Sequence, residues 1–135
     1  MKKLLLILIL SLGLIGISSA GEVDTNIKKL KALNACENCN LSRANLSKLY
    51  LEDANLRGAK LYQAKLIGAD LSFANLSGAN LKSANFSKAD LSYANLSDAN
   101  LSGASFKDAI LHEAKINGAI FCKTKMPWGI DNSGC

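Results

Sequence analysis

The chain has 135 residues, of which 49% are hydrophobic and only 6% aromatic. A single domain is expected at this length, which excludes a large multidomain enzyme, and the composition also excludes a multi-pass membrane protein. Charged residues make up 20% of the chain, close to their share in ordinary globular proteins, so a disordered tail is not expected either. The formal charge of +5 and the four cysteines raise the question of the compartment.

Residues 1–20 are typical of a secretory signal peptide. Two lysines precede an apolar segment over residues 4–17, and the small residues Ser18 and Ala20 favour cleavage after Ala20. An uncleaved membrane anchor is the alternative, but this apolar segment is shorter than the roughly 20 residues that a spanning helix needs. Cleavage would leave no integral membrane segment. It would remove two of the 16 basic residues, against 11 acidic ones, and lower the charge to +3.

Residues 21–38 are expected to form an N-terminal cap with a short α-helix over about 25–34. Asp24 or Thr25 can cap the first turn of this helix through a side-chain oxygen. Three apolar residues recur at intervals of three and would form one face of the helix: Ile27, Leu30 and Leu33. We expect this face to lie over the first of the repeats that follow, with a membrane-surface helix as the alternative.

From residue 39 to 123 the sequence repeats every five residues, as in the Ala-Asn-Leu-Ser of residues 74–77 and again of 94–97. All 17 repeats have an apolar central residue, and alanine stands two residues before that centre in 15 of them. A period of five is neither helical nor that of a strand, so the chain is expected to turn a corner every five residues. Each repeat would point one large and one small residue inward. No repeat can bury its own leucine, so the copies must stack.

These repeats resemble those of the pentapeptide-repeat family, whose signature is Ala-(Asn/Asp)-Leu-x-x. The resemblance covers residues 39–123 without an insertion. It implies an all-β solenoid, a right-handed quadrilateral β-helix with four repeats per coil and about four coils. Residues 20 apart would then stack in columns. The tail over residues 124–135 is expected to cap the C-terminal end, with Pro127 stopping strand pairing and Trp128 covering the exposed end.

The four cysteines lie at the two ends of the repeats. Cys36 and Cys39 form a C-x-x-C motif, and Cys122 and Cys135 flank the tail. About four coils would separate Cys39 from Cys122, so a single four-cysteine zinc site or a long-range bridge is implausible. Two local structural disulfides are therefore predicted, Cys36–Cys39 and Cys122–Cys135, as an exported chain favours. Redox or metal roles are the alternatives.

Four repeats per coil would sort the outward residues onto four faces. Two faces would be basic, the first with Arg43, Lys60, Lys82 and Lys123, the second with Lys48, Lys65, Lys88 and Lys107 against Asp108. The third, named the acidic face, would carry no lysine or arginine and five acids: Glu52, Asp53, Asp70, Asp90 and Glu113. The fourth would be mixed, with Arg57, Lys115 and Asp98.

The acidic face would also gather exposed aromatic and apolar side chains. Phe73 and Tyr93 are 20 residues apart and would stack in one column. Grouped with charge, such side chains indicate a binding patch, and its candidate residues are Tyr50, Asp70, Phe73, Asp90, Tyr93, Ile110 and His112. A column that only stabilises neighbouring coils is the alternative.

Catalysis is not expected from this sequence, and neither are a cofactor, a metal or a nucleic-acid partner. Ser92 and His112 would lie on one face with Asp90, but a convex rod offers no cleft or oxyanion site for a hydrolase. We expect an exported structural or protein-binding module in the periplasm, the thylakoid lumen or the medium. Its protein partner is unknown, and weak association between copies of the chain stays open.

Two other functions are weighed against this expectation. The basic faces could bind an anionic envelope polymer or lipid head groups, although their lysines are spread singly. Some relatives in the pentapeptide-repeat family mimic DNA and bind type II topoisomerases. That function needs a strongly acidic rod with cytosolic access, whereas this chain has two basic faces and a signal peptide.

Overall fold

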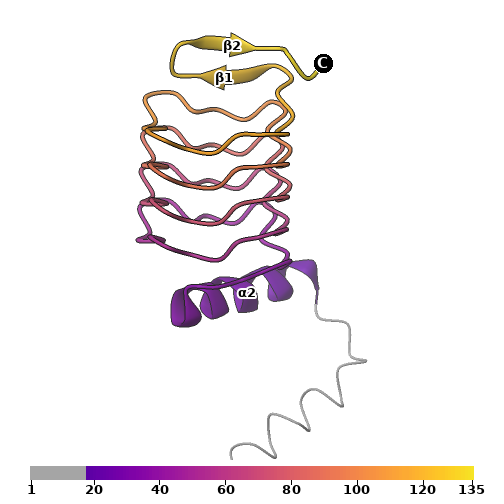
Figure 1. Ribbon diagram of the computed structural model, residues 1–135. Helices are drawn as coiled ribbons and strands as arrows, with labels where there is room; N and C mark the ends of the chain where they lie inside the picture. The colour runs from indigo at the N-terminus through magenta and orange to yellow at the C-terminus, as the bar shows by residue number, and fades with distance from the viewer. Residues whose placement is uncertain (1–17) are drawn as a thin grey trace, which may run out of the picture.

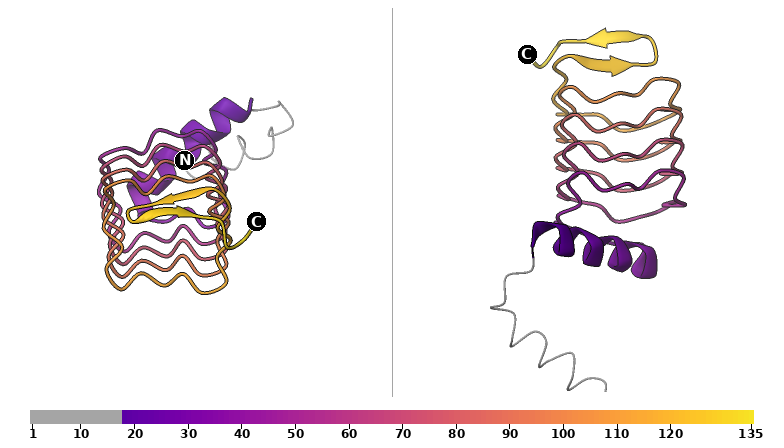
Figure 2. Two further views of the ribbon diagram at one scale, coloured as in Figure 1. Left: turned by 90° about the horizontal axis from the view of Figure 1, so that it is seen from above. Right: turned by 180° about the vertical axis from the view of Figure 1, so that it is seen from behind.

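The computed structural model describes residues 18–135, so most of the expected signal peptide lies outside the described residues. The repeats form a rod of stacked coils, with helix α2 (Ser19–Leu33) across one end and a hairpin across the other (Figure 1). The hairpin consists of strand β1 (Thr124–Met126) and strand β2 (Gly129–Asp131), which pair antiparallel. Seen along the rod axis, the coils have a roughly square outline (Figure 2).

Each coil takes 20 residues, which is four repeats. Parallel bridges join residues 20 apart along the whole rod, from Ala35 with Asn55 to Ser105 with Lys125. The backbone N–H of Leu71 donates to the Asp90 carbonyl over 2.7 Å, and equivalent bonds recur in the neighbouring coils. The stacking in columns follows the expectation, while the right-handed sense and the total of about four coils stay predictions.

The corners explain why the repeat has its particular residues. The Ala74 N–H donates to the Leu71 carbonyl over 3.0 Å and closes a tight turn. Asn75 stabilises the next turn, because its side-chain oxygen accepts from the Ser77 N–H over 3.1 Å. The residue two after each centre takes a left-handed conformation, as at Phe73 with φ 60°. Each Asn-x-Ser segment therefore forms the same kind of turn. The left-handed residue two after the centre lies at the corner and points outward.

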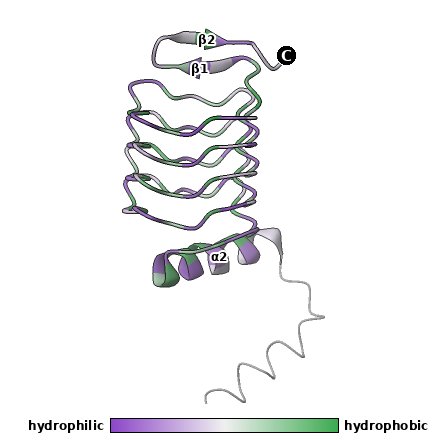
Figure 3. Cartoon of the chain, in the orientation of Figure 1, coloured by the Kyte–Doolittle hydropathy of each residue, from purple (hydrophilic) through white to green (hydrophobic). Residues whose placement is uncertain are grey.

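The interior of the rod consists of leucine and alanine in alternation. Leu91 and Ala94 are both fully buried, as are the equivalent residues of the other inner coils. Two phenylalanines take leucine positions in one column, and the rings of Phe86 and Phe106 stack with 4.8 Å between centroids. Hydrophobic and hydrophilic residues alternate along every coil (Figure 3). Large and small side chains together fill a narrow interior, and Thr124 is the only buried polar side chain among the described residues.

Helix α2 begins earlier than the sequence predicted, so the expected start near Asp24 or Thr25 is wrong. Ser18 is the N-cap, and its hydroxyl accepts from the Gly21 N–H over 3.4 Å. Thr25 lies inside the helix and does not cap it. Its hydroxyl donates to the Gly21 carbonyl over 2.9 Å. The helix therefore spans the expected cleavage point after Ala20.

The helix covers the N-terminal end of the rod with one apolar face. Leu30 is fully buried, and Val23 and Ile27 pack against the core. Leu33 was expected on this face but is 65% exposed, because the helix ends there and Asn34 turns the chain with φ 50°. Among residues 18–135, no helix is long and apolar enough to cross a membrane.

The hairpin closes the C-terminal end only in part. Thr124 is buried, and its hydroxyl donates to the Leu101 carbonyl over 2.9 Å. Strand β1 ends just before Pro127, but Trp128 lies in the turn and is 71% exposed, so the expectation that it covers the end is wrong. In the tail, the Ser133 N–H donates to Asp131 and holds the pKa of that carboxyl below its usual range.

Candidate functional site

The acidic face carries a column of aromatic rings. The Phe73 and Tyr93 rings are parallel with 4.9 Å between centroids, and the His112 ring meets the Tyr93 ring edge-on at 5.3 Å. Phe73 and Tyr93 hold the left-handed corner positions, with about half of each residue exposed. The three rings, named the aromatic column, lie together because residues at one corner stack from coil to coil.

Two acids of the expected patch have a structural role instead. The Asp70 carboxylate accepts from the Ser72 N–H over 3.1 Å and from the Ser72 hydroxyl over 2.6 Å. The Asp90 carboxylate accepts from the Ser92 N–H over 2.9 Å. Both side chains therefore close a turn as asparagine does in the other repeats, and they are less available to a partner than the sequence suggested.

The remaining residues of the patch surround the aromatic column without joining it. Tyr50 is 89% exposed and pairs through its backbone with Asp70, and no ring of residues 18–135 stacks on it. Ile110 is half-exposed and lies in the same column of residues as Asp90. Three exposed acids frame the aromatic column: Glu52, Asp53 and Glu113. In the described chain the only ion pair is Arg57 with Glu37, so these three carboxylates are unpaired.

The acidic face presents several side-chain groups that a partner could contact. The Phe73 and Tyr93 rings contact each other through their faces. The ring edges, the Tyr93 hydroxyl and the three carboxylates stay accessible to a partner. The side chains of Ser92 and His112 are not hydrogen-bonded to each other within residues 18–135. The described part of the chain also has no group of three or more histidine, cysteine, aspartate or glutamate residues that could hold a metal.

The cysteines lie in two local pairs at the two ends of the rod. The sulfurs of Cys36 and Cys39 are 2.07 Å apart, and those of Cys122 and Cys135 are 2.11 Å apart. Cys36 is fully buried beneath helix α2. The second pair ties the end of the tail to the last coil. Both pairs therefore secure the segments that cap the rod.

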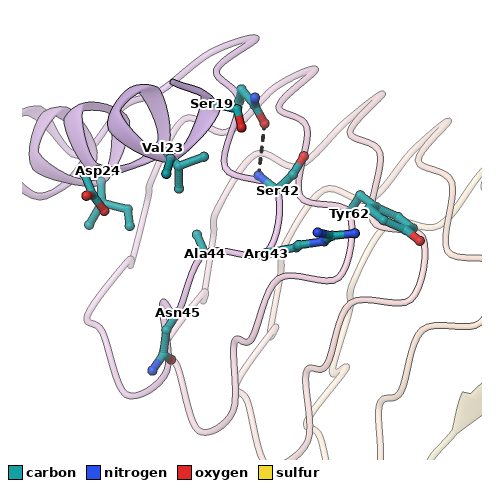
Figure 4. Close-up of a pocket in the computed structure, with 11 residues that line it drawn as sticks. Ser19, Val23, Asp24, Ser42, Arg43, Ala44, Asn45 and Tyr62 are labelled. Atoms are coloured by element: carbon teal, nitrogen blue, oxygen red, sulfur yellow. Dashed lines mark hydrogen bonds between the residues drawn. The ribbon is translucent and has the colours of Figure 1, made fainter. Parts of the chain in front are cut away.

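A groove that the sequence did not indicate lies between helix α2 and the first coil (Figure 4). Its volume is about 620 Å³, and Val23, Ile27, Arg43 and Tyr62 help to line it. It was missed because the helix was expected to begin later, and Ser19 at its edge precedes the expected cleavage point. Cleavage would therefore shorten one wall of the groove.

The open part of the C-terminal end is the second feature that the sequence did not indicate. Five of its large apolar residues are exposed: Ile110, Ile116, Ile120, Trp128 and Ile130. Ile116 is a repeat centre, yet it is 38% exposed because no further coil covers it. The Leu91 N–H bonds to the coil above, whereas the Leu111 N–H has no backbone partner among the described residues. The rod thus ends in an uncovered apolar edge.

Comparison with known proteins identifies the repeats. A family model described as pentapeptide repeats matches the chain in eight copies over residues 36–72, 64–103 and 89–126. A pentapeptide-repeat protein of the Arabidopsis thaliana thylakoid lumen has a similar structure, with 33% identity and a TM-score of 0.53. The match covers 67% of this chain and 59% of that protein.

A second solved structure shares the fold. A pentapeptide-repeat protein of the cyanobacterium Cyanothece is 24% identical, with a TM-score of 0.60 over 77% of this chain and 96% of that one. This likeness shows the coiled fold alone. No curated protein matches the chain.

The turn role of Asp70 can be tested by substitution. Asp70→Ala should lower the free energy of unfolding by about 1 kcal/mol, because the Ser72 N–H loses its acceptor. Asp70→Asn should restore most of this loss, since asparagine accepts the same bond in other repeats. Glu52→Ala removes an exposed carboxylate of the same face as a control and should change little. Urea unfolding measures all three, and equal losses at positions 70 and 52 would contradict the turn role.

Proposed function

Because the chain belongs to the pentapeptide-repeat family, we propose that it is an exported, non-catalytic module that binds a protein partner through its acidic face. The aromatic column carries this proposal. Phe73 and Tyr93 stay about half exposed although they are stacked, and they are framed by carboxylates that have no ion-pair partner within residues 18–135. Exposed aromatic side chains are enriched at protein interfaces and dominate their binding energy.

Three observations support export. The first 20 residues have the pattern of a signal peptide. Both cysteine pairs lie at disulfide distance, which suits an oxidising compartment. A protein with 33% identity over part of the chain comes from the thylakoid lumen. The proposed locations are accordingly the periplasm, the thylakoid lumen or the medium.

The chemistry of the face indicates what kind of partner it fits. The exposed acids Glu52, Asp53 and Glu113 face solvent with no lysine or arginine among the outward residues of the acidic face. A partner surface with lysine or arginine around an apolar centre would complement this face in both charge and polarity. Salt screens the attraction between exposed charges and so limits what the acids add to the affinity. The acids would mainly guide association, and the rings would supply most of the affinity.

Partner capture from the exported fraction tests this proposal. The double variant Phe73→Ala/Tyr93→Ala should lose most of the captured partner, because alanine removes the ring edges that the partner would contact. Lys60→Ala/Lys82→Ala is the matched control on the opposite face, and it should capture as much as the wild type. A quantitative mass-spectrometric comparison of the eluates gives the readout. Equal capture by the aromatic double variant and the wild type would overturn the proposed site.

The same two double variants distinguish binding through the acidic face from the alternative, in which the basic faces bind an anionic polymer or lipid. If Lys60 and Lys82 bind anionic polymer or lipid, the lysine variant should lose retention on anionic vesicles at low salt. The aromatic variant should then be retained like the wild type. The topoisomerase function receives less support, because the acids are concentrated on one face of a chain with a mature charge of +3.

Weak self-association through the C-terminal end is a second candidate, favoured by the uncovered apolar edge. Ile116→Lys should abolish any concentration-dependent increase in sedimentation coefficient, because a charge would replace an exposed apolar side chain at that edge. Tyr50→Lys, far from that end, should leave the association unchanged. A wild type that sediments as a monomer at every concentration would exclude this candidate.

A further inference from the structure

The last coil leaves one glycine without the hydrogen bond that its equivalents make. The Gly78 N–H donates to the Ser97 carbonyl over 2.9 Å, and the Gly103 N–H donates to the Cys122 carbonyl over 2.8 Å. The Gly118 N–H has no partner among the described residues, because the chain leaves the rod before it can form another coil. Gly118 is also exposed to solvent.

The residue before this glycine is an asparagine whose side chain also lacks a hydrogen-bond partner in the described part of the chain. The Asn117 side chain is exposed and makes no hydrogen bond within residues 18–135. By contrast, the Asn95 side chain accepts from the Ser97 N–H over 3.0 Å, and the following Leu96 N–H is held by the next coil. All asparagines of the chain lie in the described part, and only Asn117 has both a free side-chain amide and a free N–H after it.

Asn132 and Asn34 show how the remaining asparagines are held. The Asn132 side chain accepts from the Lys123 N–H over 2.9 Å, and the Ser133 N–H that follows it donates to Asp131. The Asn34 side chain donates to the Glu52 carbonyl over 2.7 Å. Each has at least one of the two groups engaged, so neither combines a free amide with a free N–H.

We propose that Asn117 and Gly118 form a site of spontaneous deamidation, with water as the co-reactant. The Gly118 nitrogen attacks Cγ of Asn117 and forms a five-membered succinimide, while the bond between Cγ and the amide nitrogen breaks. The Gly118 proton leaves with that nitrogen as ammonia. Water then opens the ring at either carbonyl, giving aspartate or isoaspartate at this position. Glycine favours the attack because it has no side chain to hinder its nitrogen.

The turn that contains Asn117 and Gly118 affects how fast deamidation can occur in the folded chain. The Ala119 N–H donates to the Ile116 carbonyl over 3.1 Å, so the turn must open locally before the two reacting atoms can meet. Opening is easier here than inside the rod, because no coil lies above this one. The reaction should therefore be slower than in the unfolded chain and faster than at an Asn-Gly pair in an inner coil.

Deamidation would act on the end of the rod. The Asp98 N–H donates to the Asn117 carbonyl over 2.9 Å, and the Asp98 side chain lies against Gly118. A new carboxylate at position 117 would place a second negative charge near Asp98. The isoaspartyl product would also lengthen the backbone by one methylene within the last turn. Both changes should loosen the last coil while the inner coils stay intact.

The inner coils supply a matched control. Ser77→Asn creates a second Asn-Gly pair, at Gly78, whose N–H is bonded to the Ser97 carbonyl. The folded variant is incubated at mildly alkaline pH, at a concentration where it sediments as a monomer, and peptides are followed by mass spectrometry. Asn117 should deamidate at least about tenfold faster than the introduced asparagine. At the introduced pair, the Gly78 N–H must first break its hydrogen bond to the next coil, whereas the Gly118 N–H has no such bond among the described residues. In denaturant the two rates should converge.

Two outcomes would overturn the proposal. The first is an Asn117 that stays intact in the folded chain while it deamidates in denaturant. The second is equal rates at the two Asn-Gly pairs in the folded chain, which would mean that the free N–H of the last coil makes no difference. Asn117→Gln serves as the control for the identity of the product, because it should remove the modified peptide.

Discussion

The stacking of one coil on the next is the interaction on which the rest of the structure depends. No repeat can bury its central leucine or satisfy its backbone alone, so Leu91 is fully buried only because coils lie on both sides of it. Where stacking ends, the same residue types behave differently. Ile116 is a central residue of the last coil, and it is 38% exposed. The two ends of the rod therefore need caps, and they differ in how well they are covered.

Stacking also decides what the surface can do. Residues 20 apart are brought side by side, so Phe73 and Tyr93 form a column although they are distant in sequence. The same geometry separates charges by face and leaves the carboxylates around the rings without basic neighbours on that face. A rigid scaffold of this kind presents side chains in fixed positions and loses little conformational entropy on binding. A binding module can thus be built from corner residues alone.

The repeating part of the molecule could be predicted from the sequence, because its period directly reflects the geometry of the coil. The neighbourhood of Phe73 and Tyr93 followed from that period together with the four repeats per coil that the resemblance to the pentapeptide-repeat family implied. The roles of Asp70 and Asp90 did not, since the same carboxylate either faces a partner or closes a turn depending on the local hydrogen bonds. The caps have no period, so the early start of helix α2 and the exposure of Trp128 depended on packing that no pattern encodes.

A double-mutant cycle on the aromatic column tests the 20-residue coil most directly. The free energies of unfolding of Phe73→Ala, Tyr93→Ala and the double variant give the coupling between the two rings. Stacked rings should couple by about 0.5–1.5 kcal/mol, whereas Tyr50 and Tyr93, which do not touch, should show no coupling. An absence of coupling between Phe73 and Tyr93 would mean that residues 20 apart are not neighbours, and would contradict the coil on which the fold and the proposed site both depend.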